Sequence, residues 1–185
     1  SKNAVISSAS LTIEQTVNEK KDYIAQNNET LNFQINYKNT ATAAIKDVVI
    51  TSKIQDSFSV LDLSTLKTDN GSAVNNIITW NSSQVKDLGL LSPGQEGKLS
   101  FSIKIKSQLP IAKSSDKNFS FDNILKIDSL SPPLNLLGTQ IGQEDKLTVK
   151  IATQLQFGAK VYFKEGPFSN SGPLPPKAGE KTTYT

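Results

Sequence analysis

The sequence predicts an all-β protein folded as an antiparallel β-sandwich, and three observations support this prediction. Apolar residues recur at every second position along most of the chain, turn-forming residues separate these runs, and no stretch shows a convincing helical period. In the clearest run, Leu99, Phe101, Ile103 and Ile105 alternate with Lys and Ser. This pattern is typical of a strand with one buried and one solvated face.

The first pair of strands is expected over Thr30–Ile54, where a short segment of Asn, Thr and Ala joins two alternating runs into a hairpin. Asp69–Gly71 is expected to form a type I′ turn, and Ser92–Gly94 a further turn. The other expected strands are Ser10–Val17, Ser57–Leu63, Asn75–Trp80, Gly97–Lys106, Phe119–Ile127 and Lys146–Phe157, followed by Ala159–Phe163.

The composition excludes several kinds of chemistry. The chain has no Cys, His or Met, and all 20 basic residues are Lys. Zinc fingers, thiol nucleophiles and Ser-His-Asp triads are therefore excluded. The net charge of +3 is scattered, whereas nucleic-acid binding usually shows clustered cations, so no nucleic-acid partner is expected.

No apolar run approaches the roughly 20 residues that span a bilayer, so no transmembrane segment is expected. The chain starts at Ser1 without an initiator Met or a signal-like segment, which indicates a processed chain or an excised fragment. Any export signal or membrane anchor would then lie outside these residues.

An internal similarity suggests a tandem array. The pattern of Ser10–Phe33 recurs loosely over Lys146–Thr185, as if a second unit had just begun. The proline-rich segment 165–179 is expected to be an extended linker, or alternatively a long loop inside one larger domain. The expected parts are a lead-in (1–9), a complete repeat (10–131), a connection (132–145), a β-hairpin (146–164), the linker (165–179) and the first strand of a truncated second repeat (180–185).

Four stretches resemble, in order and spacing, the conserved repeat domain (domain of unknown function eleven) of bacterial and archaeal surface proteins. They are NETLNFQINYKNTATAAIKDVVITSKI from Asn28, IITW at Ile77–Trp80, LGLLSPGQEGKLSFSIKIK from Leu88 and FDNILKIDS from Phe121. The frame covers Ser10–Ser131, and its most specific part is Leu88–Gly94 followed by an alternating strand. The family's usual Gly is missing at Asn39-Thr40-Ala41, and its Leu-Pro is replaced by Ile54-Gln55.

The resemblance implies an immunoglobulin-like sandwich located outside the cell, with the opening strands of a second repeat or a β-extension at its C-terminus. The run Gly172–Tyr184 also looks like the entrance to such a repeat. The family offers no shared catalytic residues to carry over, so the resemblance says little about ligands.

Candidate sites in the sequence are weak. Three Ser-x-x-Lys pairs lack the Ser-Asp-Asn and Lys-Thr-Gly partners of acylating enzymes; they are Ser64/Lys67, Ser83/Lys86 and Ser114/Lys117. Neither Glu144-Asp145 nor Thr68–Gly71 offers the ligand array of a calcium loop. Four glycosylation sequons are as frequent as chance predicts. Trp80 is expected to fill the core between the sheets. We therefore expect no catalytic, cofactor-binding or metal-binding residues and no cofactor.

The function expected is that of a non-enzymatic structural or adhesive repeat that spaces or assembles a cell-surface protein or filament. The alternative is a carbohydrate- or protein-binding module that uses the loops Asp69–Asn75 and Ser92–Gly97. The expected partners are neighbouring repeats or identical copies, which would pair through open sheet edges formed by Lys146–Phe163 and Thr182–Thr185. A Lys46–Asn123 amide crosslink is a further hypothesis, because both residues share the parity of buried neighbours.

Overall fold

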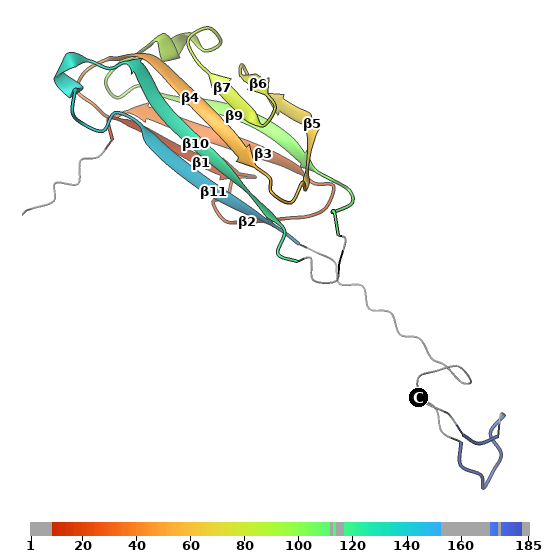
Figure 1. The fold of residues 1–185 in the computed structure, drawn as a ribbon. Coiled ribbons are helices and arrows are strands. Elements are labelled where there is room, and N and C mark those ends of the chain that lie inside the picture. The colour runs from red at the N-terminus through yellow and green to blue at the C-terminus, as the bar shows by residue number, and fades with distance from the viewer. Residues whose placement is uncertain (1–8, 112, 114–116, 153–170, 174, 183–185) are drawn as a thin grey trace, which may run out of the picture. The chain divides into compact units, whose positions relative to one another are not determined.

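A computed structural model of the chain describes residues 9–111, 113, 117–152, 171–173 and 175–182. The chain divides into two compact units, residues 1–153 and 154–185. Figure 1 shows that the first unit is a β-sandwich. Its elements are β1 (Leu11–Val17), β2 (Tyr23–Ala25), β3 (Thr30–Asn39), β4 (Ile45–Gln55), β5 (Leu61–Thr68), β6 (Ser72–Val74), β7 (Ile77–Trp80), the 3-10 helix η1 (Lys86–Gly89), β8 (Leu90–Leu91), β9 (Glu96–Ile105), β10 (Ser120–Ser131), the 3-10 helix η2 (Leu134–Leu136) and β11 (Gln143–Ile151).

Two sheets face each other. The first, sheet A, has four strands in the order β1-β3-β9-β5. The second, sheet B, has seven strands in the order β2-β11-β10-β4-β7-β6, with β8 also paired to β4. Neighbouring strands are antiparallel except that β2 runs parallel to β11. The predicted all-β, immunoglobulin-like sandwich is confirmed.

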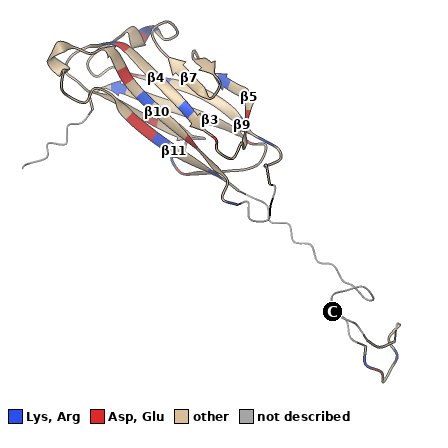
Figure 2. Ribbon diagram, viewed as in Figure 1, with Lys and Arg blue, Asp and Glu red and all other residues tan. Residues whose placement is uncertain are grey.

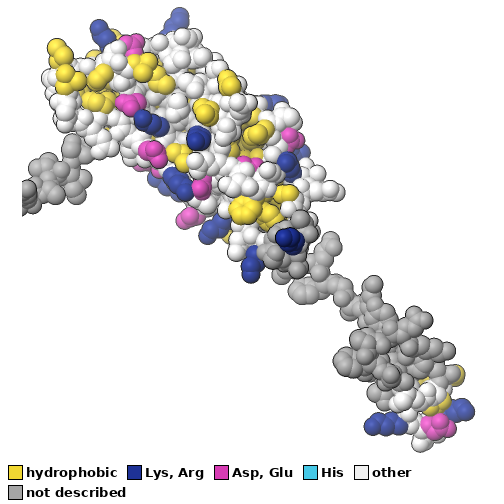
Figure 3. All heavy atoms as spheres, in the orientation of Figure 1, with side chains coloured by type: hydrophobic (Ala, Val, Ile, Leu, Met, Phe, Trp, Pro, Cys, Tyr) yellow, Lys and Arg dark blue, Asp and Glu magenta, His cyan; other side chains and the backbone are white. Residues whose placement is uncertain are grey.

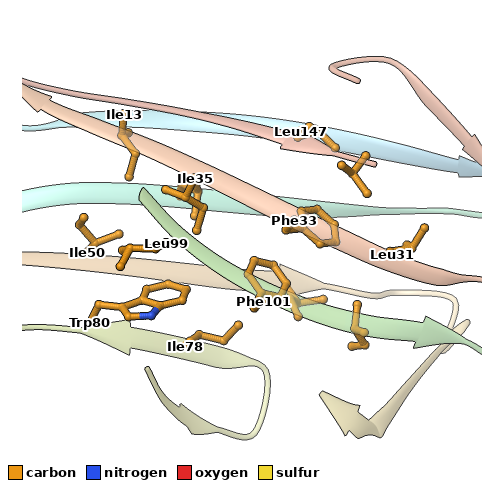
Figure 4. Packing of buried hydrophobic residues seen from close by; sticks show 14 of the residues in the cluster. Ile13, Leu31, Phe33, Ile35, Ile50, Ile78, Trp80, Leu99, Phe101 and Leu147 are labelled. Atoms are coloured by element: carbon orange, nitrogen blue, oxygen red, sulfur yellow. The ribbon is translucent and has the colours of Figure 1, made fainter. Parts of the chain in front are cut away.

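The core lies between the sheets and follows the predicted alternation. In β3, Leu31, Phe33, Ile35 and Tyr37 are buried while the intervening side chains are exposed. Phe33 stacks on Phe101 of the neighbouring strand with ring centroids 4.5 Å apart, and its edge meets Phe121 of sheet B (Figure 4). Aromatic pairs of this kind add about 0.5–1.5 kcal/mol beyond the burial of their surface.

The predicted hairpin over Thr30–Ile54 is wrong, because β3 belongs to sheet A and β4 to sheet B. Residues 40–44 cross between the sheets, and the side chain of Asn39 organises this crossing. Its amide donates to the carbonyl oxygens of Ala43 (2.9 Å) and Leu91 (2.8 Å), and its Oδ1 accepts from the N–H of Ala41 (2.9 Å). Two alternating runs joined by a short link fit a crossing as well as a hairpin.

The type I′ turn predicted at Asp69–Gly71 is also wrong, since this segment leads from β5 in sheet A to β6 in sheet B. The indole N–H of Trp80 donates to the carbonyl oxygen of Asp69 (3.0 Å). Gly71 packs so closely that a Cβ would lie 2.6 Å from Trp80 Nε1. Here Gly is needed for close approach to the indole ring rather than for a hairpin.

The fifth strand begins later than predicted. Both carboxylate oxygens of Asp56 accept hydrogen bonds, from the N–H groups of Val60 (3.0 Å) and Leu61 (2.8 Å), and Ser59 has a positive φ of 54°. These features hold residues 56–60 in a loop, so β5 starts at Leu61. The pattern also missed β2, β6 and β8, which are too short to show a period.

The sandwich continues to Ile151, because β11 pairs with β10 over Gln143–Lys150. The sequence predicts a connection over 132–145 and a β-hairpin of the next repeat over 146–164, whereas β11 spans parts of both ranges and belongs to this sandwich. The parts of the later predicted strands that fall on residues 153–163 and 183–185 lie outside the described residues. Among the described residues of the second unit, Thr182 Oγ1 donates to the carbonyl oxygen of Pro173 (3.2 Å), and the N–H of Glu180 donates to the carbonyl oxygen of Lys177 (3.2 Å) across a turn.

Candidate functional site

The two ends of the sandwich are where its chain enters and leaves. Four positions of the first strand bond to partners located 130 residues later: Ser10 to Gln140, Leu11 to Ile141, Ile13 to Gln143 and Gln15 to Asp145. A constant separation means that the two segments run in parallel. The chain therefore enters beside Leu11 at one end, here called the entry pole, and leaves after Ile151 at the other, the exit pole.

The contact between residues 10–15 and 140–145, here called the seam, joins the edge of sheet A to sheet B. Two of its bonds are between backbone groups: Ser10 N–H to the Gln140 carbonyl (3.1 Å) and Leu11 N–H to the Ile141 carbonyl (2.7 Å). Two others use side chains as acceptors. Ile13 N–H donates to Gln143 Oε1 (3.1 Å) and Gln15 N–H to Asp145 Oδ2 (3.2 Å).

A buried polar network continues the seam into the core. Gln15 is 1% exposed, and its Nε2 donates to the carbonyl oxygens of Asn123 (3.1 Å) and Asp145 (3.0 Å). Asn123 is fully buried; its amide donates to Gln15 Oε1 (2.8 Å), and its Oδ1 accepts from Ser52 Oγ (2.7 Å). The network thus links β1, β11, β10 and β4, and its buried polar groups have partners.

The hypothesis of a Lys46–Asn123 crosslink fails on geometry. Asp47 has a φ of 51°, which places an irregularity in β4 and reverses the parity of the strand before Val48. Ile45 is therefore buried and Lys46 exposed. The Asn123 side chain is directed instead to Gln15 and Ser52.

The edge expected to be open along Lys146–Phe163 is covered by β2 over Val149–Ile151. β11 lies between β10 and β2, and the N–H of Ala152 donates to the carbonyl oxygen of Ala25 (2.9 Å). On the opposite side of the sandwich, β5 is interrupted by a register shift between Asp62 and Lys67, and β6 has three residues. Short and irregular edges of this kind discourage pairing with other chains. The expected pairing of residues 153–163 and 183–185 falls outside the described residues.

Exposed apolar side chains gather at both poles, and charged groups cover the sheets between them. Figure 2 shows acidic and basic positions interspersed along β10 and β11, and Figure 3 shows hydrophobic side chains gathered at the end that holds η2. The entry pole exposes Leu90, Leu130, Leu134 and Leu137, and the exit pole exposes Ile24, Phe58 and Ile111. Three further exposed apolar residues, Leu63, Val74 and Ile77, lie on β5, β6 and β7.

The loops proposed for ligand binding do not come together. Asp69 N–H donates to the carbonyl of Ser100 in the middle of β9, whereas the segment Ser92–Gly97 leads into the start of that strand. Three residues of strand, or about 10 Å, separate Ser100 from Gly97, the nearest end of the second loop, and residues 72–75 continue into β6 of the other sheet. Trp80 is completely buried, as predicted, so it offers no aromatic platform for a sugar.

The other candidates are not assembled for chemistry. Ser64 lies in β5 and donates to Asp62 Oδ1 (2.6 Å), and Ser83 lies in a turn; Ser114 is outside the described residues. Glu144 and Asp145 point to opposite faces of β11, with Asp145 directed to the seam. Within the described ranges, no group of three or more acidic side chains could hold a metal ion.

The seam and its buried network were not predicted from the sequence, although the pattern contains a signal for them. Gln15, Ser52 and Asn123 each stand at an inward position of an otherwise apolar alternation, and Gln143 and Asp145 hold the inward parity of Leu147 and Val149. Inward polar residues on several strands predict a buried network, because unpaired polar groups are costly in a core.

Comparison with solved structures finds sandwich proteins of low identity. The CARDB domain of the PF1109 protein from Pyrococcus furiosus, crystallised with di-metal ions, is 13% identical, with 77% of this chain and 87% of that chain covered and a TM-score of 0.40. The major pilin subunit BcpA of Bacillus cereus is 17% identical, with 76% and 40% covered and a TM-score of 0.48. A family 123 glycoside hydrolase from Clostridium perfringens is 9% identical, with 80% and 28% covered and a TM-score of 0.44. Likenesses this distant carry no argument about activity or partners.

No curated protein matches the chain in sequence. In the described part of the chain, no helix is long and apolar enough to cross a membrane. The family model that matches is not that of the conserved repeat domain to which the resemblance pointed. It is a domain of unknown function (DUF7619), and it matches residues 11–123, from the first residue of β1 to the network residue Asn123. Because this span is more than half of the chain, the protein belongs to the DUF7619 family.

Proposed function

We propose that the sandwich is a non-catalytic structural module that holds apart the segments before and after it in an extracellular surface protein. One observation carries this proposal: the chain enters at one pole and leaves at the other. A unit with this connection adds its own length to the chain. A unit whose ends lay at the same pole would branch off as a side domain.

The distribution of side chains supports the proposal. Among the described residues, seven of the ten exposed large apolar side chains lie at the poles, where consecutive units of an array would meet, and the sheet faces between the poles are mostly polar. In arrays of repeats, each unit contacts its immediate neighbours. Such an array needs units that contact one another at their poles and keep their sheet faces in solvent.

An extracellular location and tandem repetition are part of this proposal; they come from the resemblance to the surface repeat family, and the matching DUF7619 model, of unknown function, adds nothing to them. In the proposed array, the proline-rich segment 165–179 links one unit to the next. Proline-rich chains extend by about 3.1 Å per residue and are semi-rigid, so such a linker would keep consecutive units from folding back on one another.

A two-copy fusion of residues 1–185 would test the proposal by small-angle X-ray scattering, with the single copy as control. We expect the maximum dimension to grow by at least the length of one sandwich, and the scattering to stay that of an extended particle. If the two copies fold back on one another without this increase, the spacer function is wrong. Saturable glycan or protein binding that is lost on substitution in 69–75 or 92–97 would favour the alternative binding function.

A further inference from the structure

The seam has a geometry suited to resisting force. Because β1 begins at the entry pole and β11 ends at the exit pole, tension along the chain pulls these adjacent parallel segments in opposite directions. Their hydrogen bonds are then loaded together, in shear. Bonds that are loaded one after another, as when a hairpin is unzipped, open at a lower force.

Hydrogen bonds between the two loaded segments recur at every level of the seam. The backbone N–H groups of Ser10 and Leu11 donate the first two bonds, and Gln143 Oε1 accepts the third from the N–H of Ile13. Asp145 accepts the last two from Gln15, one through its carboxylate and one through its carbonyl oxygen. A carboxylate acceptor strengthens such a bond. The seam therefore has five bonds between segments that the chain itself would pull apart.

The far end of the seam is anchored in the core. The Gln15 side chain is held by Asn123, and Asn123 by Ser52, so β1 cannot slide along β11 without breaking a buried network. Broken bonds in that interior would leave polar groups away from water, which raises the barrier to sliding.

The geometry points to a force-bearing role: the seam is a clamp that keeps the sandwich folded when its two poles are pulled apart. As a role in the organism, this rests on the proposed function, because only a module within a chain under tension is loaded in this way. The resistance of the seam itself depends on the topology and the named bonds alone.

Optical tweezers would test the clamp on the full chain, tethered through its two ends. Gln143→Ala and Asp145→Ala each remove one side-chain acceptor from the seam, and we expect each to speed unfolding at a fixed load roughly two- to tenfold. Thr148→Val is the matched control on the same strand, since it removes the bond from Thr148 Oγ1 to Asp122 Oδ1 on the outer face. Its unfolding rate under load should stay within about twofold of the original.

A second experiment changes the pulling direction and leaves the residues of the seam as they are. The chain has no cysteine, so Leu137→Cys, at an exposed position of the entry pole, provides a single attachment point. Pulling from residue 137 against the N-terminus loads the seam bonds one after another, and we expect unfolding at a clearly lower force than between the two ends. Equal forces in the two directions, or equal acceleration by seam and control variants, would overturn the clamp. Neither result would bear on the spacer function, which the scattering experiment tests separately.

Discussion

On one side of the sandwich, β1 and β11 are joined by hydrogen bonds in which the side chains of Gln143 and Asp145 accept and the side chain of Gln15 donates. On the other side, β5 and β6 are joined by the chain itself, which crosses between the sheets at Asp69–Gly71. The seam is held by hydrogen bonds between polar groups, and the crossing is held by the close packing of Gly71 against Trp80. The two sides should therefore respond differently to substitution.

The largest expected effect is on the crossing side. Trp80→Ala removes a fully buried side chain that packs on Phe101, and should lower the free energy of unfolding by about 3–5 kcal/mol. Trp80→Phe keeps an aromatic ring but removes the bond to Asp69, so its loss should be smaller. Urea denaturation measures both. A loss below about 1 kcal/mol for Trp80→Ala would show that packing does not hold this side.

On the seam side, Asn123→Ala would leave Gln15 Oε1 and Ser52 Oγ buried without these partners. We expect the free energy of unfolding to fall by about 2–4 kcal/mol, since each unpaired buried group costs roughly 1–3 kcal/mol. A double-mutant cycle with Gln15→Ala measures the coupling directly. If the two losses simply add, Gln15 and Asn123 do not act as one network.

Gly71→Ala tests the close packing of the crossing with the smallest possible change. The added Cβ would lie 2.4 Å from Thr68 Oγ1 and 2.6 Å from Trp80 Nε1, so neighbouring groups must move. We expect a loss of about 1–3 kcal/mol in thermal or urea unfolding. Gly89→Ala is the control, because its Cβ would come no closer than 3.3 Å to Ser82 Cβ. Equal effects at both glycines would contradict the proposed packing.

The smallest expected effect concerns the outer face of sheet B, away from both sides. Burial alone would raise the pKa of Asp122, but hydrogen bonds from Lys146 (2.8 Å) and Thr148 (2.6 Å) hold that pKa below its ordinary value. This stabilisation is present above the unfolded pKa of about 4 and is lost as pH falls through the lower folded pKa.

Because Lys146 and Asp122 are partly exposed, the stabilisation lost on acidification should stay below about 1 kcal/mol. Urea unfolding at pH 6 and pH 3 measures it, and Asp122→Asn should reduce the difference between the two pH values. An unchanged difference in the variant would mean that other groups cause the acid sensitivity.

Alternation predicted the longer strands and the core, including Trp80, because burial on one face of a sheet leaves a period of two in the sequence; β2, β6 and β8 are too short to show that period. It could not assign strands to sheets: a short link after Asn39 and an Asn-Gly step at Asn70 suit a hairpin as well as a crossing. The seam was harder to predict, since residues 13 and 143 are brought together by the topology of the whole sandwich. The inward polar residues Gln15 and Asn123 were its visible sign.

The account depends most directly on the chain entering and leaving at opposite poles. Pulsed electron paramagnetic resonance between spin labels on Ala9→Cys and Ala152→Cys measures this in the full chain, which has no other cysteine. Ala9 precedes Ser10, which is level with Gln140, so roughly thirteen residues separate the two levels and we expect about 35–45 Å between the labels at about 3.3 Å per residue. A pair on Ala9→Cys and Leu137→Cys, both at the entry pole, should give a clearly shorter distance. A distance of about 20 Å or less between positions 9 and 152 would contradict the account.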